Sequence, residues 1–132
     1  MFRATAKAFA TDNEAAKLSY KIYKNKEQWA DYKLEERHFI LLPLMHAESR
    51  SYGQTMVQAF IDLDREYAEK DSDRYNNQGI GKFTQYLVGY AQKHYAPVQR
   101  FGRYPHRNKH LGRESTPEEL EYLASETATW AK

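Results

Sequence analysis

Apolar residues recur along most of this chain at the three- and four-residue spacing of an amphipathic helix. The clearest case is the segment of residues 51–70, where the spacing places four side chains on one stripe: Met56, Phe60, Leu63 and Tyr67. A stripe of this kind is typical of a helix that faces a protein core, rather than of a cofactor site. No segment has the alternation of a β-strand or the signature of a hairpin. The pattern predicts an all-α fold.

The same spacing predicts a first helix near residues 11–24, with its apolar face formed by Ala15, Leu18 and Ile22. A second, largely buried helix is expected within residues 31–49. Proline lacks the N–H that a helix interior uses, so Pro43 should kink this second helix.

Two further features follow in the second half of the chain. Residues 71–81 are rich in Asp, Ser, Asn and Gly, which favour turns, and are expected to form a loop. After this loop, a fourth helix should present one face and end before Pro97 or slightly later. The residues expected on that face are Ile80, Phe83, Leu87, Tyr90, Ala91 and His94.

The last helix has the most specific start signal in the sequence. Thr116 suits the N-cap, Pro117 the first helical position, and Glu119 completes a capping box. Short connections between consecutive helices predict antiparallel neighbours, in a bundle or a short solenoid. No exact repeat with a period near 34 residues is present, so a regular tetratricopeptide array is not predicted by the sequence alone.

The composition narrows the class of protein. A chain of 132 residues with 41% hydrophobic and 29% charged residues is expected to fold as a single domain over residues 1–132. The absence of cysteine excludes disulfides, zinc–thiolate sites and cysteine nucleophiles, and it fits a cytoplasmic protein. The longest apolar run, residues 39–45, is far too short to cross a bilayer, so no membrane association is expected.

Charge is distributed unevenly, although the net charge is only +2. Residues 93–113 contain six Lys or Arg residues, three histidines and no acid, whereas residues 62–73 contain six acids and two bases. Gly102 and Pro105 argue for an irregular turn within the basic segment. An irregular turn can direct several guanidinium groups to one point, and guanidinium binds carboxylate or phosphate through two parallel hydrogen bonds.

Three stretches identify a family that this chain resembles. These are "AFATD" at residues 8–12, "ERHFILLPLMHAES" at residues 36–49 and "RFGRYPHRNKHLGRESTPEELEYL" at residues 100–123. Together they resemble the uncharacterised DUF924 family. The resemblance implies an all-helical, tetratricopeptide-like fold and no established activity.

The resemblance also implies that the chain is shortened at its N-terminus. Family members usually carry a preceding tryptophan-rich helical region and a "DQFPRN"-like motif, and this sequence begins after the position of that motif. Apolar surface that those helices would cover is then expected to be exposed, and formation of a homo-oligomer would cover it.

The candidate site combines the end of the second helix with the basic turn. His46 and Glu48 match an "HSE"-like motif of the family, and the turn supplies arginines as anion ligands. The expected pocket residues are His46, Glu48, His94, Arg100, Arg103, His106, Arg107, Asn108 and Arg113. The leading hypothesis is a binding domain for an anionic small molecule or a peptide carboxylate. No cofactor and no metal ligands are assigned.

Three alternatives remain open from the sequence. In the first, the arginines form a purely structural ion-pair network with acids such as Glu14, Glu48 or Glu119. A hydrolase would use His106 or His46 as a general base, with or without a metal ion, but no nucleophile motif supports it. Weak RNA binding would use the aromatic residues among the basic ones, although no RNA-binding signature is present, so nucleic acid is not a favoured partner. Whether the protein is an enzyme stays open.

Overall fold

The computed structural model describes residues 11–125, and every regular element within this range is a helix. Part of the "AFATD" stretch, residues 8–10, lies outside the described residues. In chain order the elements are α1 (Asp12–Lys24), α2 (Lys26–Asp31), α3 (Leu34–His46), α4 (Arg50–Lys70), α5 (Ser72–Asn77), α6 (Ile80–Phe101), the short 3-10 helix η2 (Pro105–Arg107), α7 (Asn108–Leu111) and α8 (Pro117–Ser125). The all-α prediction is confirmed.

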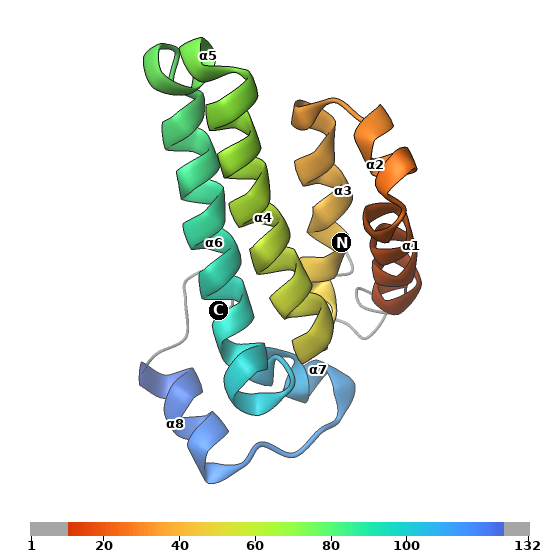
Figure 1. Cartoon of the computed structure of the whole chain (residues 1–132). Helices are drawn as coiled ribbons and strands as arrows, with labels where there is room; N and C mark the ends of the chain where they lie inside the picture. Colours follow the sequence, from red (N-terminus) through yellow and green to blue (C-terminus); the bar gives the residue numbers. More distant parts are fainter. Residues whose placement is uncertain (1–10, 126–132) are drawn as a thin grey trace.

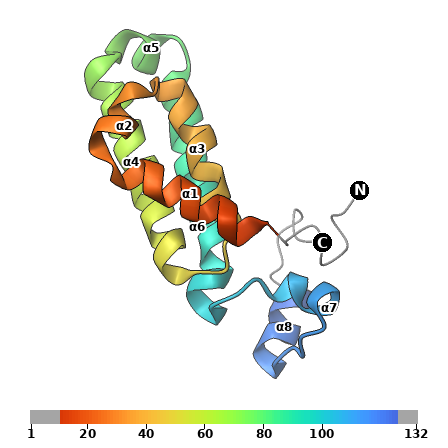
Figure 2. The same ribbon diagram turned by 90° about the vertical axis from the view of Figure 1, so that its right-hand side faces the viewer.

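Helices α4 and α6 form the long axis of the molecule (Figure 1). They run antiparallel, joined at one end through α5, while α3 and α1 pack beside α4 in a second layer (Figure 2). Helices α7 and α8 both lie at the opposite end, near the last turns of α6. Within the described range no helix is both long and apolar enough to span a bilayer.

The core lies where α3, α4 and α6 meet. All four residues of the predicted stripe on α4 are buried. Two of them, Met56 and Phe60, belong to one cluster with Leu41 and Leu44 of α3 and Ala91 of α6. A close approach between the two long helices depends on Gly53, because a Cβ atom there would lie 2.3 Å from the ring of Tyr95.

The predicted helices are present, but several details differ. The buried side of α1 carries Ala16 and Ser19, whereas Ala15 and Leu18 are exposed, so the predicted face was wrong. The reason is that small residues allow α1 to lie close against α3, while a larger apolar residue points outward. The segment expected to be a single loop contains α5.

Both prolines expected to disturb helices lie inside them. Helix α3 continues through Pro43 to His46, and α6 continues through Pro97 to Phe101. Gly102 then ends α6 with a left-handed backbone conformation, φ 76°. This conformation is readily available to glycine and turns the chain toward η2. The fold thus delivers the basic segment to one end of the bundle.

Five large hydrophobic side chains remain exposed in the described part of the chain: Leu18, Phe39, Phe83, Tyr86 and Leu120. Exposed apolar side chains are expected singly on any protein surface, but a group of neighbours is less usual. Self-association, which would cover such a group, stays a prediction at this point.

Candidate functional site

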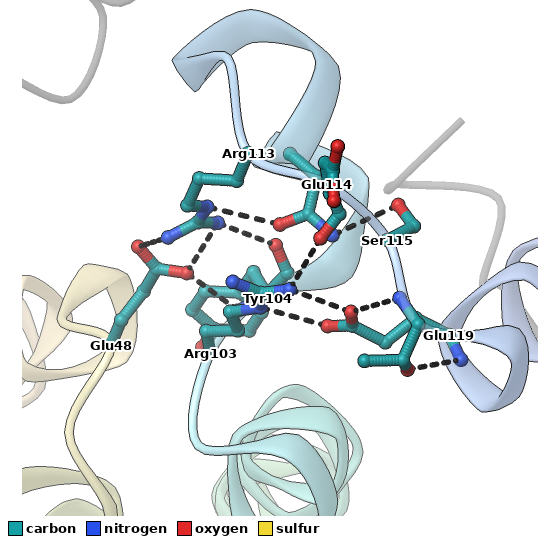
Figure 3. A network of polar contacts seen from close by, with 9 residues as sticks. Glu48, Arg103, Tyr104, Arg113, Glu114, Ser115 and Glu119 are labelled. Atoms are coloured by element: carbon teal, nitrogen blue, oxygen red, sulfur yellow. Dashed lines mark hydrogen bonds and ion pairs between the residues drawn. The ribbon is translucent and has the colours of Figure 1, made fainter.

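Glu48 lies in the short connection between α3 and α4, and this position directs its carboxylate at the basic segment. The connection is extended at Ala47 and Ser49, and the Ser49 hydroxyl caps α4 by accepting a hydrogen bond from the Tyr52 N–H at 3.1 Å. Helix α3 therefore ends two residues before Glu48, and α4 begins two residues after it. Its side chain reaches across to the segment that follows α6 (Figure 3).

The Glu48 carboxylate is held by Arg113 and Tyr104. Arg113 donates from both terminal nitrogens, each at 2.9 Å, and the Tyr104 N–H donates at 2.7 Å. Arg113 also donates to the Tyr104 carbonyl at 3.2 Å and to the Asn108 side-chain oxygen at 3.0 Å (Figure 3). Burial alone would raise the pKa of Glu48, but these hydrogen bonds and the charges of Arg113 and Arg107 hold its pKa below the usual value.

Arg103 makes the second ion pair of the segment, with Glu119 at the start of α8. Two of its nitrogens donate to the Glu119 carboxylate at 2.8 and 2.7 Å, and one also donates to the Glu114 carbonyl at 2.9 Å (Figure 3). The Arg103 hydrogen bonds are the main cause that lowers the pKa of Glu119 to about 2, since burial opposes them. The Glu119 side chain is only 2% exposed, so this pair ties α8 to the end of α6.

The capping box at the start of α8 is confirmed. The Glu119 carboxylate accepts from the Thr116 N–H at 2.9 Å, and the Thr116 hydroxyl accepts from the Glu119 N–H at 3.1 Å. One carboxylate therefore serves the helix cap and Arg103 together. Acids at this N-terminus recruit an arginine, as the sequence suggested.

Tyr104 is a central residue of this region that the sequence did not place in the site. Its ring is buried, its hydroxyl donates to the carbonyl of Met45 at the end of α3, and its backbone contacts Glu48 and Arg113. Burial raises the pKa of its phenol. The signal available in the sequence was only a tyrosine between two arginines, which does not distinguish a buried anchor from a surface residue.

Arg107 occupies a different position from the other two arginines. Its side chain is 7% exposed, and its guanidinium lies 3.7 Å from a carboxylate oxygen of Asp12 and 4.0 Å from one of Glu48. Its guanidinium carbon lies 4.7 Å from the centre of the Tyr104 ring. Burial lowers the pKa of this guanidinium, although an arginine remains charged at any physiological pH.

Three histidines from three elements lie near one another, and two of them, His46 and His106, lie near Arg107. His106 precedes it in η2, with its ring 5.6 Å from that of Tyr104, and burial followed by the charge of Arg107 lowers the pKa of His106 to about 4. His94 of α6 is buried, its Nδ1 lies 3.0 Å from the Tyr90 carbonyl, and burial lowers its pKa. His46 ends α3 near enough to Asp12 and Arg107 to feel both charges, but its side chain is exposed.

The structure thus divides the nine predicted site residues. Glu48, Asn108 and Arg113 belong to one hydrogen-bonded network, and Arg103 belongs to the adjoining pair with Glu119. His46, His94, His106 and Arg107 form the second group. Arg100 is exposed at the end of α6, where its guanidinium lies 4.7 Å from the ring centre of Phe101.

The site offers little for catalysis. A general base works best with a pKa near the operating pH, and a pKa of about 4 makes His106 a weak base. The Ser115 hydroxyl accepts a hydrogen bond from Asn108 rather than facing a histidine. In the part of the chain that the structure describes, no group of three or more His, Asp or Glu side chains is arranged to hold a metal ion.

A cavity of about 270 Å³ lies elsewhere, between α1, α2 and α4. Its walls include the aromatic rings of Tyr23 and Trp29, with Ala59 and Leu63 of α4 beneath them. Two lysines and two acids also line it, so its charges balance. This cavity is separate from the basic segment and was not predicted from the sequence.

The low pKa of His106 predicts a loss of stability in mild acid. An unfolded histidine binds a proton near pH 6.5, whereas folded His106 does so only near pH 4, so the unfolded state binds more protons between these values. The free energy of unfolding should therefore fall by about 1 to 2 kcal/mol between pH 7 and pH 5 from this residue. Urea unfolding at each pH measures it. The His106→Gln variant should show a shallower fall, and an unchanged slope would contradict the assignment.

Comparison with known proteins shows which family and which solved structure the chain is similar to. A family model described as a bacterial protein of unknown function, DUF924, matches residues 1–127. No curated protein matches the chain. A solved structure of a protein of unknown function from Agrobacterium tumefaciens is similar at 32% identity and a TM-score of 0.65. The match covers 93% of this chain and 58% of that one, so this chain spans less than two thirds of that protein's length.

Proposed function

The chain belongs to DUF924, a family of bacterial proteins of unknown function, and we propose that it is a helical binding domain that binds a small anionic group at Arg107. The anion would be a carboxylate or a phosphate, of a small molecule or a peptide. His46, His94 and His106 would complete the site as hydrogen-bonding groups. The proposal assigns no catalytic step.

The carrying observation is the burial of the Arg107 guanidinium beside histidines. The Arg107 side chain is 7% exposed, whereas those of Arg103 and Arg113 are 29% and 25% exposed. Arg103 and Arg113 each hold a carboxylate through two hydrogen bonds of 2.7 to 2.9 Å, so they serve the structure of the turn. A planar guanidinium is well suited to a bidentate anion, and in a buried position the attraction is screened less by water.

The histidines favour a ligand that accepts hydrogen bonds. With pKa values below the usual range, His94 and His106 are neutral at pH 7. A neutral imidazole has one N–H; that of His94 is directed at the Tyr90 carbonyl, and that of His106 would donate to the anion. A neutral ring also brings no second positive charge beside Arg107. The arrangement is therefore suited to one negative group rather than to a polyanion such as RNA, which needs several cations along its backbone.

A thermal-shift titration with inorganic phosphate and with citrate tests the proposal. For a dissociation constant of about 1 mM, about 10 mM ligand should stabilise the fold by about 1.4 kcal/mol, a rise in Tm of about 5 °C. Arg107→Gln should abolish this rise, measured from the variant's own Tm. Arg100→Gln is the matched control, because it removes an exposed guanidinium from the same segment.

The result that would refute an anion site is equally specific. Wild type and Arg107→Gln would then respond identically to both anions, or neither would respond. If Arg107→Gln does not fold, the imidazole proton resonances of His106 in the wild type give the second readout. They should shift on addition of phosphate at constant pH and ionic strength, and unmoved resonances would reject the site.

A further inference from the structure

Helices α3 and α6 share an exposed surface that the proposed function does not use. Phe39 of α3 is 68% exposed, and Phe83 and Tyr86 of α6 are 47% and 64% exposed. His38 lies between the two helices, its ring 4.9 Å from that of Phe39 and 5.7 Å from that of Phe83. These four residues are here called the aromatic face.

The aromatic face continues along α6. The rings of Tyr86 and Tyr90 stack at 6.0 Å, and Tyr90 in turn lies 4.0 Å from His94. Neighbouring exposed aromatic rings on two helices form a contiguous apolar surface, which in monomeric proteins usually marks a place of contact. Within the described residues, the Nδ1 atom of His38 is buried without a hydrogen-bond partner.

The first turns of α3 and α6 carry opposite charges. Glu36 lies in the first turn of α3 and Lys82 in the first turn of α6, and both helices begin at the α5 end of the molecule (Figure 1). The contact between His38 and Phe83 confirms that the two first turns are level. Since α3 and α6 run in the same direction, Glu36 on α3 and Lys82 on α6 lie at the same end of the aromatic face.

We propose that the aromatic face binds a second copy of this chain in a two-fold symmetric dimer. A two-fold axis parallel to the helices places α3 of one copy opposite α6 of the other. The aromatic rings then meet across the axis, and Glu36 of each copy meets Lys82 of its partner, so both charged pairs form at once. Only an arrangement with such self-complementarity closes as a dimer, since an isologous interface uses the same surface twice.

The dimer rests on observations separate from those at Arg107. Its core would be aromatic, which is the composition enriched at the centre of protein interfaces, and its rim would be charged. The number of side chains is small, so the association should be weak, with a dissociation constant on the order of 10 µM. The competing occupant is a further segment of a longer polypeptide, in which case this chain alone is monomeric.

Sedimentation velocity of the whole chain from about 5 to about 200 µM tests the proposal. Wild type should show a reversible dimer. Phe39→Ser and Phe83→Ser should each weaken the dimer at least about tenfold. Leu120→Ser is the matched control, because Leu120 is 57% exposed but lies on α8, away from the aromatic face.

Charge-reversal variants test whether the dimer has the proposed geometry or forms by nonspecific apolar association. Lys82→Glu and Glu36→Lys should each weaken the dimer, and an equimolar mixture of the two variants should restore it, because the mixed dimer has one native and one reversed pair. Glu36 also accepts from the Lys33 N–H at 2.8 Å, so the Tm of each variant is measured alongside. A monomeric wild type at about 200 µM, equal loss in Leu120→Ser, or a mixture that fails to associate would each overturn the proposal.

Discussion

Replacing Glu48 by alanine should lower the free energy of unfolding by about 3 kcal/mol, the lower end of the range for breaking a buried ion pair, because its side chain is 21% exposed and that of Arg113 25%. The carboxylate accepts three hydrogen bonds of 2.7 to 2.9 Å, from Arg113 and from the Tyr104 N–H. Its removal leaves the Arg113 guanidinium in a partly buried position without a carboxylate. It also leaves a backbone N–H with no acceptor in place, and such a group costs about 1 to 3 kcal/mol when buried.

Urea unfolding of Glu48→Ala against wild type measures this loss. Glu14→Ala is a suitable control, because Glu14 is exposed and its pair with Lys17, at 3.6 Å, should contribute less than about 1 kcal/mol. Glu48→Gln should fall between the two, since the amide oxygen can still accept from the Tyr104 N–H. A loss of under about 1 kcal/mol in Glu48→Ala would show that the connection between α3 and α4 does not depend on this contact.

Arg103→Ala should cost about 3 kcal/mol, near the lower end for a buried pair because the Arg103 side chain is 29% exposed. The expected loss arises mainly from Glu119, whose carboxylate would stay buried without its cationic partner, although the Thr116 N–H and the Asn108 side chain still reach it. Adding phosphate should not restore the stability, because the unmet group is an anion. This is the behaviour expected of a structural ion pair.

A double-mutant cycle with Glu119→Gln isolates the pair. The coupling energy should lie in the range of about 1 to 3 kcal/mol that contacting residues show. Arg100→Ala provides the control for loss of an exposed arginine from the same segment. Recovery of Arg103→Ala by phosphate, or a coupling near zero, would instead indicate that Arg103 serves an anionic ligand.

These two predictions bear on what the basic segment is for. Two of its arginines hold the turn to α8 and to the connection between α3 and α4. The structural alternative considered from the sequence is thus realised at Arg103 and Arg113, with Glu48 and Glu119 as partners. Glu14, also considered, pairs with Lys17. Anion binding is left to Arg107 and the histidines as a proposal.

Local signals predicted the elements that depend on local physics. The stripe on α4 and the capping box at Thr116 both appear in the structure, because side-chain periodicity and N-cap hydrogen bonds act over only a few residues. The face of α1 was wrong, since Leu18 is exposed and Ser19 is buried. Apolar residues lie on more than one side of α1, and only its fit against α3 selects which side is covered.

At the candidate site too, the sequence indicated the region but not the individual ion pairs. The sequence marked Glu48 and the basic turn as one region, and it named Glu48 and Glu119 among the acids that a structural network would pair with the arginines. It could not assign Arg103 to Glu119 and Arg113 to Glu48. Those pairings join residues 16 and 65 positions apart, so they depend on where Gly102 turns the chain.

By itself, the sequence determined that this protein is built of helices, where the main ones lie and where its positive charge concentrates, because helix periodicity, capping and composition are local properties. Only the tertiary structure decided that two of the arginines are occupied by carboxylates, that Arg107 lies deeper among histidines, and that Phe39 and Phe83 share an exposed surface. The physical reason is that ion pairing and burial depend on distances through space, which are set when the helices pack.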